Sequence, residues 1–188
     1  MAKESNLSEL RLPPQALEAE EAVLGAMLTS KDAVGQAMEI LTSDTFYKEV
    51  NAKIFRAMED LFNSSNPVDA ISLINELKKR KQLDTCGGSY YITGLSDSVP
   101  TSANTEHYAK IVLEKASLRR LIEVSAMLSQ DAYQDREELD DIMDKAEQRI
   151  FAISQNRLRG GFLHLNPILQ ATFEELDRIH QKPGTVTG

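Results

Sequence analysis

The stretch "NTEHYAKIVLEKASLRRLIEVSAMLSQDAY", residues 104–133, contains neither glycine nor proline. A run of this length without a helix breaker favours one long α-helix. Its apolar residues cover more than one stripe of that helix, which predicts packing against more than one neighbour. They are Tyr108, Ile111, Val112, Leu118, Leu121, Ile122, Met127 and Leu128.

A second helix is predicted directly after the first. Asp135 can cap it, and Glu138, three residues later, completes a pattern like a capping box. Apolar residues then follow at steps of four, three, four and three, which is the spacing of an a/d seam; they are Leu139, Met143, Ala146, Ile150 and Ile153. A short polar turn joins the two helices, so we expect an antiparallel hairpin over 104–156. A hairpin alone cannot bury both faces, so some apolar surface should remain for a partner.

Upstream of the hairpin, the spacing of apolar residues predicts a globular helical head over 13–103, preceded by a flexible N-terminus over 1–12. Its first helix opens in "PPQALEAEEAVLGAML", residues 13–28. Glu18, Glu20 and Glu21 fall in the first turn or two, where the helix dipole favours carboxylates by about 0.3–1 kcal/mol each. We therefore interpret these glutamates as residues that start a helix.

Three further segments complete the predicted head. A helix over 32–41 is followed by a helix from about 47 to 62, with Ser43 and Asp44 as capping residues. Asp69 is predicted to cap the next helix, and the glycine turn in "GGSYYITGL" leads into a short helix or extended piece. Residues expected to face the core are Val34, Met38, Leu41, Ile54, Phe55, Met58, Leu61, Phe62, Ile71, Ile74 and Leu77, and the short piece carries Tyr90, Tyr91, Ile92 and Leu95.

The last segment, 157–188, is predicted to be a linker with a docking helix. "RLRGGFLHLNP" reads as the linker, and an amphipathic helix follows over 167–180. Its apolar side has Ile168, Leu169, Phe173 and Leu176. Because such a helix has no core of its own, we expect it to dock on another surface. The predicted fold class is therefore all-α: a head, a long hairpin and a separate amphipathic linker helix.

Composition narrows the possible functions. The 188-residue chain has a net charge of −8, which is unfavourable for independent binding of nucleic acid. The short basic runs, "KKRK" at 78–81, Arg119–Arg120, and Arg157 with Arg159, are interpreted as solvated helix faces and helix ends. No window is apolar enough to span a membrane, the N-terminus does not resemble a signal peptide, and Cys86 is the only cysteine, so a cytoplasmic location is expected.

Motifs for chemistry are not found. The sequence contains no phosphate-binding G-x-x-x-x-G-K-[ST] loop and no G-x-G-x-x-G. The histidines, 107, 164 and 180, lack the spacing of metal ligands. Glu18 and Glu21 lie one helical turn apart, as a metal-binding pair would, but no second pair with a histidine accompanies them. We predict no catalytic, cofactor or metal residues, and a carboxylate-metal enzyme stays as an alternative.

Six segments in register give a resemblance that covers nearly all of residues 12–188. They are "PPQALEAEEAVLGAML", "DTFYKEVNAKIFRAMEDL", "NPVDAISL", "LDTCGGSYYITGL", "SVPTSANTEHYAKIVLEKASLRRLI" and "LDDIMDKAEQRIFAIS". In this order they resemble the N-terminal part of bacterial replicative DNA helicases of the DnaB family, and "GTVTG" at 184–188 resembles the entry to that family's motor domain. One departure is Asn51-Ala52-Lys53, where the family often has a His–Arg-like pair.

The resemblance implies a collar of a hexamer. It implies pairing through hairpin contacts, recruitment of primase, a linker helix on a neighbouring motor domain, and possible contact with a helicase loader. ATP, magnesium, unwinding and most DNA contact would belong to a C-terminal motor domain, which this sequence lacks. The implied primase-facing residues are Glu18, Tyr91, Ile122 and Leu128. A primase's helicase-binding domain has a similar head and hairpin, but the linker helix and "GTVTG" argue against that alternative.

Overall fold

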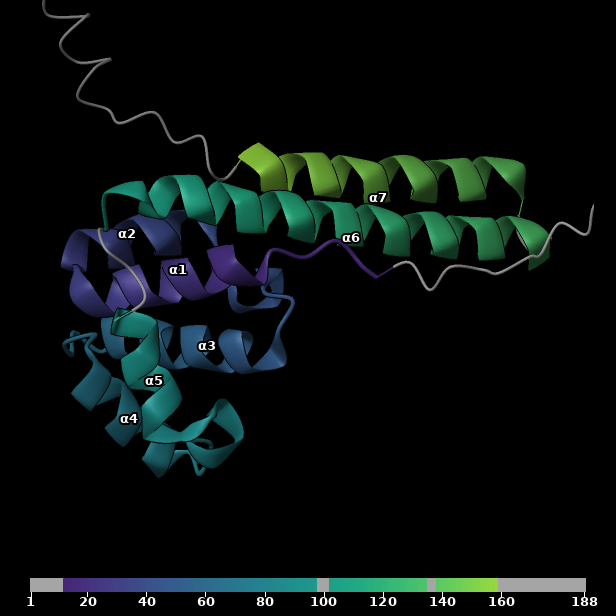
Figure 1. Cartoon of the computed structure of the whole chain (residues 1–188). Helices are drawn as coiled ribbons and strands as arrows, with labels where there is room; N and C mark the ends of the chain where they lie inside the picture. Colours follow the sequence, from purple (N-terminus) through teal and green to yellow (C-terminus); the bar gives the residue numbers. More distant parts are fainter. Residues whose placement is uncertain (1–11, 98–101, 135–137, 159–188) are drawn as a thin grey trace, which may run out of the picture.

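The computed structural model describes residues 12–97, 102–134 and 138–158, and all regular structure in these ranges is helical. The predicted linker helix at 167–180, the Asp135 cap and the N-terminal residues before Leu12 lie outside the described residues. Within these described ranges, five α-helices form the head and two long helices form the hairpin (Figure 1). In order they are α1 (Leu17–Thr29), α2 (Lys31–Ile40), α3 (Glu49–Asn63), α4 (Ala70–Lys79), α5 (Gly88–Asp97), α6 (Thr105–Gln134) and α7 (Leu139–Leu158), with short 3-10 turns η1 (Ser43–Thr45), η2 (Asp84–Cys86) and η3 (Ser102–Asn104).

Helix α1 lies at the centre of the head. It packs against α2, α3, α5 and α6. This position requires apolar residues around most of the helix, and Val23, Leu24 and Met27 are completely buried.

Most predicted core positions of α3 and α4 are correct, and two are wrong. Phe62 is 40% exposed and Ile71 is 76% exposed. In α4 the buried residues are Leu73 and Leu77, which lie one turn apart. Ile71 is two residues from Leu73, about 200° around the helix, and so faces away from the core. Asp69 caps α4 as predicted, because its carboxylate accepts the Ser72 N–H at 2.8 Å.

The prediction that Ser43 and Asp44 cap the third helix is wrong. These residues form η1, and α3 begins only at Glu49. The residue at the N-cap position of α3, Lys48, gives no side-chain cap. The hydrogen-bond acceptor for the N–H groups at the start of α3 therefore comes from another element of the fold.

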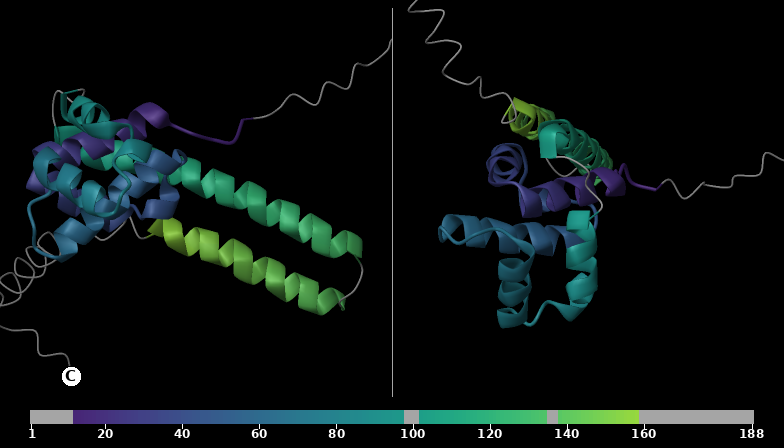
Figure 2. Two further views of the ribbon diagram at one scale, coloured as in Figure 1. Left: turned by 90° about the horizontal axis from the view of Figure 1, so that it is seen from below. Right: turned by 60° about the vertical axis from the view of Figure 1, so that its left-hand side comes forward.

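The hairpin is antiparallel, as predicted, and it extends well beyond the head (Figures 1 and 2). The first part of α6 packs on α1 and α2, and its remainder packs on α7. Ala109 and Val112 of α6 are buried in the same apolar cluster as the head. The core of the head therefore includes the first turns of α6, while the division of the chain into domains stays a prediction.

The predicted seam of α7 is correct at Ala146 and Ile153 and wrong at its other three positions. Leu139, Met143 and Ile150 are 70%, 52% and 48% exposed. The less exposed residues that follow a four-three-four spacing are Ile142, Ala146, Arg149 and Ile153. Arg149 is included because its guanidinium pairs with Asp131 of α6 at 2.9 Å. With this face of α7 turned toward α6, Leu139, Met143 and Ile150 point outward.

Candidate partner-binding site

A buried glutamate caps α3 from another helix. Glu20 of α1 is 1% exposed, and its Oε1 accepts the Tyr47 N–H at 2.6 Å. Its Oε2 accepts the Lys48 N–H at 3.3 Å and the Asn51 side-chain amide at 2.9 Å. A carboxylate is favoured at this end of a helix because the first N–H groups have no partners within the helix. The interpretation of Glu20 as a residue that only starts α1 is therefore wrong.

A second polar cluster joins α1, α3 and α5 beside this cap. Lys48 donates to Glu21 and to the Tyr91 hydroxyl, each at 3.1 Å, and its ammonium lies 4.7 Å from the centroid of the Tyr91 ring. The Tyr91 hydroxyl lies 2.9 Å from acceptor oxygens of both Glu21 and Asn51. The hydrogen bond with Tyr91 raises the pKa of Lys48, and burial raises the pKa of Tyr91. Glu21 thus also has a tertiary role.

Arg119 links the hairpin to the head. Its guanidinium donates to the Pro14 carbonyl at 2.8 Å and to the Thr45 carbonyl at 2.6 Å. It also lies over the Tyr47 ring, 5.5 Å from the centroid. Burial lowers the pKa of Arg119, and the nearby charge of Glu20 opposes this effect. Arg119 is therefore not the solvated residue that the sequence predicted, whereas Arg120 is exposed and pairs with Glu123 at 2.8 Å.

The four residues proposed from the resemblance lie in different environments. Glu18 is exposed on α1, and Tyr91 is half-buried in the polar cluster. Ile122 is 57% exposed on α6, and Leu128 is half-buried farther along the same helix. Among the described residues, these four side chains share no hydrogen bond, ion pair or ring contact with one another. They therefore form no single preassembled cluster, and their role stays a prediction.

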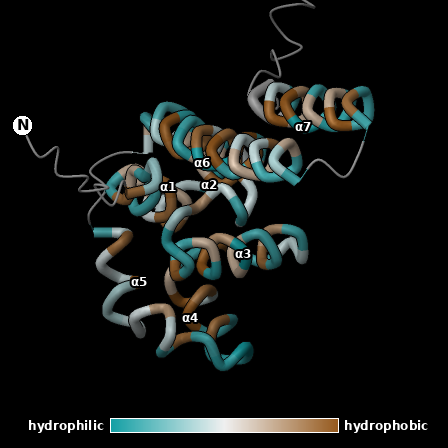
Figure 3. Tube along the Cα trace, turned by 90° about the vertical axis from the view of Figure 1, so that its right-hand side faces the viewer, coloured by the Kyte–Doolittle hydropathy of each residue, from teal (hydrophilic) through white to brown (hydrophobic). Residues whose placement is uncertain are grey.

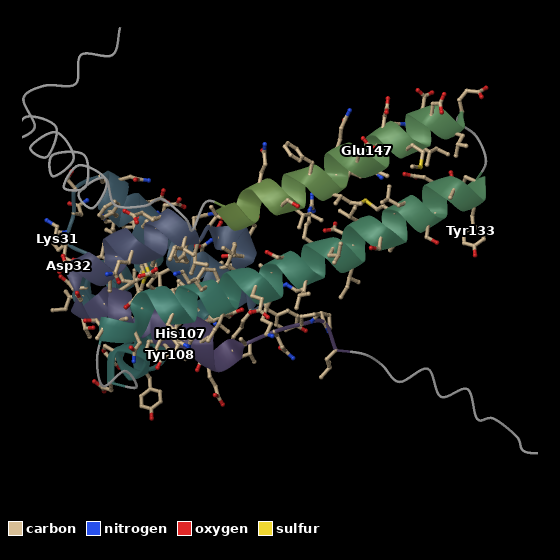
Figure 4. All side chains as sticks on the ribbon, turned by 90° about the horizontal axis from the view of Figure 1, so that it is seen from above. Lys31, Asp32, His107, Tyr108, Tyr133 and Glu147 are labelled. Carbon is tan, nitrogen blue, oxygen red and sulfur yellow. The ribbon has the colours of Figure 1, made fainter. Side chains whose placement is uncertain are left out.

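Apolar side chains are exposed along the hairpin. On α6, Leu118, Leu121 and Ile122 are 39%, 44% and 57% exposed. Phe151 on α7 is 63% exposed, and brown apolar segments occur on both helices in Figure 3. Figure 4 places Tyr133 at the far end of the hairpin, where its side chain is 89% exposed. Such surface is typical of a contact with another chain.

Other kinds of site find little support in the described residues. No three His, Cys, Asp or Glu side chains gather there as a metal site would require. In the same part of the chain, no helix combines the length and apolar character of a membrane span. The docking face predicted for the linker helix, Ile168, Leu169, Phe173 and Leu176, lies outside the described residues.

Sequence reasoning missed three residues that organise the head: Glu20, Asn51 and Arg119. Asn51 is completely buried, at one of the positions where the sequence departs from the pattern of the family it resembles. Glu20 follows apolar Ala19 and precedes the Val23–Leu24 pair, so its place on the buried side of α1 could have been read from helical spacing. The partners of Glu20 and Arg119 are far away in sequence and could not have been read in that way.

Comparison with known proteins assigns the family. Residues 12–114 match the model of the DnaB-like helicase N terminal domain. The chain belongs to this family. A crystal structure of the N-terminal domain of DnaB helicase from Mycobacterium tuberculosis is 38% identical and superposes with a TM-score of 0.71, over 75% of this chain and 99% of that one. The all-helical DnaB-type fold predicted from the sequence is thus confirmed.

The curated relatives of this DnaB-type chain are longer proteins. Replicative DNA helicase DnaB of Geobacillus stearothermophilus is 40% identical over 184 residues, which are 98% of this chain and 40% of that protein. Replicative DNA helicase DnaC of Bacillus subtilis is 39% identical and is matched over 39% of its length. The chain therefore spans about 40% of the length of these relatives. A DnaB-like replicative helicase whose structure was described with its interactions with primase shares the fold, with 22% identity, a TM-score of 0.63, and coverage of 92% of this chain and 37% of that one.

Proposed function

We propose that this chain is the N-terminal collar and primase-recruiting part of a hexameric replicative DNA helicase. In this proposal ATP-driven unwinding belongs to a motor domain not contained in these 188 residues. The observation that carries the proposal is the long hairpin with exposed apolar residues on both helices, in a chain that belongs to the DnaB N-terminal family. The relatives' activity on DNA is carried over as part of this proposal.

The chain itself is proposed to be catalytically inactive. It has no phosphate-binding loop, so its residues do not fit ATP and magnesium, which we assign to the motor domain. One carboxylate of the alternative metal site, Glu21, instead contacts Lys48 and Tyr91. DNA-stimulated ATP hydrolysis by the pure chain would contradict this assignment.

Pairing of hairpins is the first part of the proposal to test. Leu118, Leu121 and Ile122 form an exposed apolar strip on α6, and Ile122→Asp places a charge within it. Burying an unpaired charge in a dry contact costs several kcal/mol. Since about 1.4 kcal/mol corresponds to a tenfold change, dimerisation should weaken at least about tenfold. Gln130→Asp is the matched control, because it introduces the same charge at an exposed position of α6 outside the strip.

Sedimentation equilibrium would give the association constants, and circular dichroism would confirm that helicity is kept. Equal constants for Ile122→Asp, Gln130→Asp and the unmodified chain would remove Ile122 from the pairing surface. Leu128→Asp gives a separate outcome: its half-buried position predicts that helicity and pairing both decrease.

Recruitment of primase is the second part of the proposal to test. We propose that the head and hairpin contribute together, with Glu18, Tyr91, Ile122 and Leu128 as the residues to probe. Because the Tyr91 hydroxyl is occupied by Lys48, Glu21 and Asn51, we expect Tyr91 to act by holding α1, α3 and α5 in place. Calorimetric titration with a primase C-terminal domain should give weaker binding for Glu18→Gln with unchanged thermal stability. For Tyr91→Ala both affinity and stability should fall.

The linker helix at 167–180 is proposed to dock on a neighbouring motor domain through Ile168, Leu169, Phe173 and Leu176. A replacement such as Phe173→Asp, made in a chain that includes the motor domain, should weaken the hexamer but leave dimerisation of the present chain unchanged. Loss of dimerisation in the present chain would contradict this role. A helicase loader is a further partner within the same proposal.

A further inference from the structure

The connection between head and hairpin depends on one helix. Helix α7 packs mainly against α6, while α6 also packs on α1, α2 and η1. Ala109 and Val112 hold the beginning of α6 in the head's core, and the last part of α6 extends beyond the head (Figure 2). The direction of the whole hairpin is therefore decided where α6 leaves the head.

Arg119 lies at this point and contacts two separate segments of the head. One side of its guanidinium donates to the Pro14 carbonyl, before α1, and the other donates to the Thr45 carbonyl in η1. The Tyr47 ring lies against the same guanidinium. A planar group with several fixed donors can hold such an arrangement, whereas a lysine ammonium on a flexible stem cannot reproduce it.

Apolar packing does not fill the neighbouring space. A groove of about 480 Å³ runs between η1, α6 and the end of α7, and it is lined by Thr42, Thr45, Ala116, Arg119 and Ile153, among others. Because side chains leave this groove open, close packing of the hairpin against η1 is limited here. The polar contacts of Arg119 therefore restrain rotation of the hairpin at this place, in addition to the apolar contacts of Ala109 and Val112.

The exposed strip of α6 turns together with Arg119. At about 100° per residue, Leu118 and Ile122 lie roughly 60–100° from Arg119 around the helix, and Leu121 lies farther around on the same side. All three are exposed, whereas Arg119 faces the head. Because one rigid helix contains all four residues, fixing Arg119 also fixes the direction in which the strip faces.

We propose that Arg119 is a positioning residue that sets the direction of the hairpin relative to the head, and with it the orientation of the apolar strip Leu118–Leu121–Ile122. The consequence for pairing rests on the proposed function. The mechanical role of Arg119 within one chain does not.

The experiment measures a distance between head and hairpin. Spin labels are attached at Asn63→Cys in α3 and Gln130→Cys in α6, which are exposed positions. Cys86 is buried, and burial raises the pKa of its thiol, so it should not react in the folded chain. Labelling under native conditions should therefore add two labels, which mass spectrometry can verify. Pulsed dipolar spectroscopy on labelled chains diluted with unlabelled chains reports the distance within one chain. Arg119→Ala and Arg119→Lys are compared with Arg120→Ala, which removes only the exposed pair with Glu123.

We expect one narrow distance distribution for the unmodified chain and Arg120→Ala, and a distribution about twofold wider for both Arg119 variants. Equal widths for all four proteins would overturn the proposal. If Arg119→Ala does not fold, Arg119→Lys decides the result, because it keeps the charge and most of the stem.

Pairing is measured separately by sedimentation. Weaker association of Arg119→Lys than of Arg120→Ala supports the link between orientation and pairing. Equal association together with a wider distance distribution would refute that link. An unmodified chain that does not self-associate would refute the proposed pairing. The widths of the distance distributions would still decide the role of Arg119.

Discussion

Replacing Glu20 by glutamine should destabilise the fold more than any comparable change at an exposed glutamate. Glutamine has nearly the same shape but keeps one acceptor oxygen. Its NH₂ group then faces the Lys48 N–H or the Asn51 amide, both of which are donors in this structure. The 2.6 Å bond from the Tyr47 N–H can persist, so the loss concerns the second oxygen and the negative charge.

The magnitude follows from these contacts. A hydrogen bond to a charged group contributes about 1.5–3 kcal/mol, and the 2.9 Å contact with Asn51 is of this kind. The 3.3 Å contact with the Lys48 N–H is too long to add much. A charge at the start of a helix adds about 0.3–1 kcal/mol. We therefore expect Glu20→Gln to lower the free energy of unfolding by about 2–4 kcal/mol, which corresponds to a decrease in Tm of about 4–16 °C.

Urea unfolding followed by circular dichroism at a fixed protein concentration would measure this change. Glu18→Gln is the matched control on the same helix, since Glu18 is exposed and should change stability by at most about 0.5 kcal/mol. A double-mutant cycle with Asn51→Ala should return a coupling energy of about 1–3 kcal/mol. A Glu20→Gln variant as stable as the Glu18→Gln control, or a coupling energy of zero, would refute the capping role of Glu20.

Three more predictions concern the turn before α5, the helix itself and its polar cluster. Gly87→Ala should lower stability by more than about 1 kcal/mol in thermal unfolding, because Gly87 has φ of +85° and an added Cβ would lie 2.7 Å from the Tyr91 Cβ. Gly94→Ala, in a helix with nothing within 4 Å of the added Cβ, should instead stabilise the fold by about 0.5–1 kcal/mol, and a loss of stability there would contradict the exposed position of Gly94 in α5. Stability should also fall as the pH rises above about 10, because the pKa values of Lys48 and Tyr91 are both raised on folding, so the folded state keeps these protons longer than the unfolded state does. A Lys48→Met/Tyr91→Phe variant should show a shallower alkaline decrease in urea titrations, and an unchanged slope would remove these two groups as its cause.

Glu20 of α1 and Arg119 of α6 both make hydrogen bonds to the short region between Thr45 and the start of α3. Glu20 contacts the residues that begin α3, and Arg119 contacts the backbone of η1 just before them. The position of α3 and the direction of the hairpin are thus restrained within a few residues of Thr45. A change at either residue should therefore affect both parts of the molecule.

The helices and most of the core can be predicted from the amino-acid sequence. Helical spacing of apolar residues, the absence of Gly and Pro over 104–133, and the Asp69 cap are local features, and local geometry alone makes them readable. The same reasoning correctly gave an antiparallel hairpin, since a short connection leaves two long helices little other choice. It also gave a surplus of apolar surface, which the exposed residues of α6 and α7 now locate.

The roles of the polar residues, and the side that some helices bury, depend on contacts that form in the folded chain. Glu20 and Asn51 are 31 residues apart, and Arg119 and Pro14 are 105 apart, so no spacing rule could pair them. The register of α7 also required the folded chain, in which Arg149 pairs with Asp131 and Leu139, Met143 and Ile150 face outward. Apolar burial is non-directional and leaves a pattern along the chain, whereas a hydrogen bond or ion pair needs a particular partner at a particular distance, and only the folded chain provides that partner.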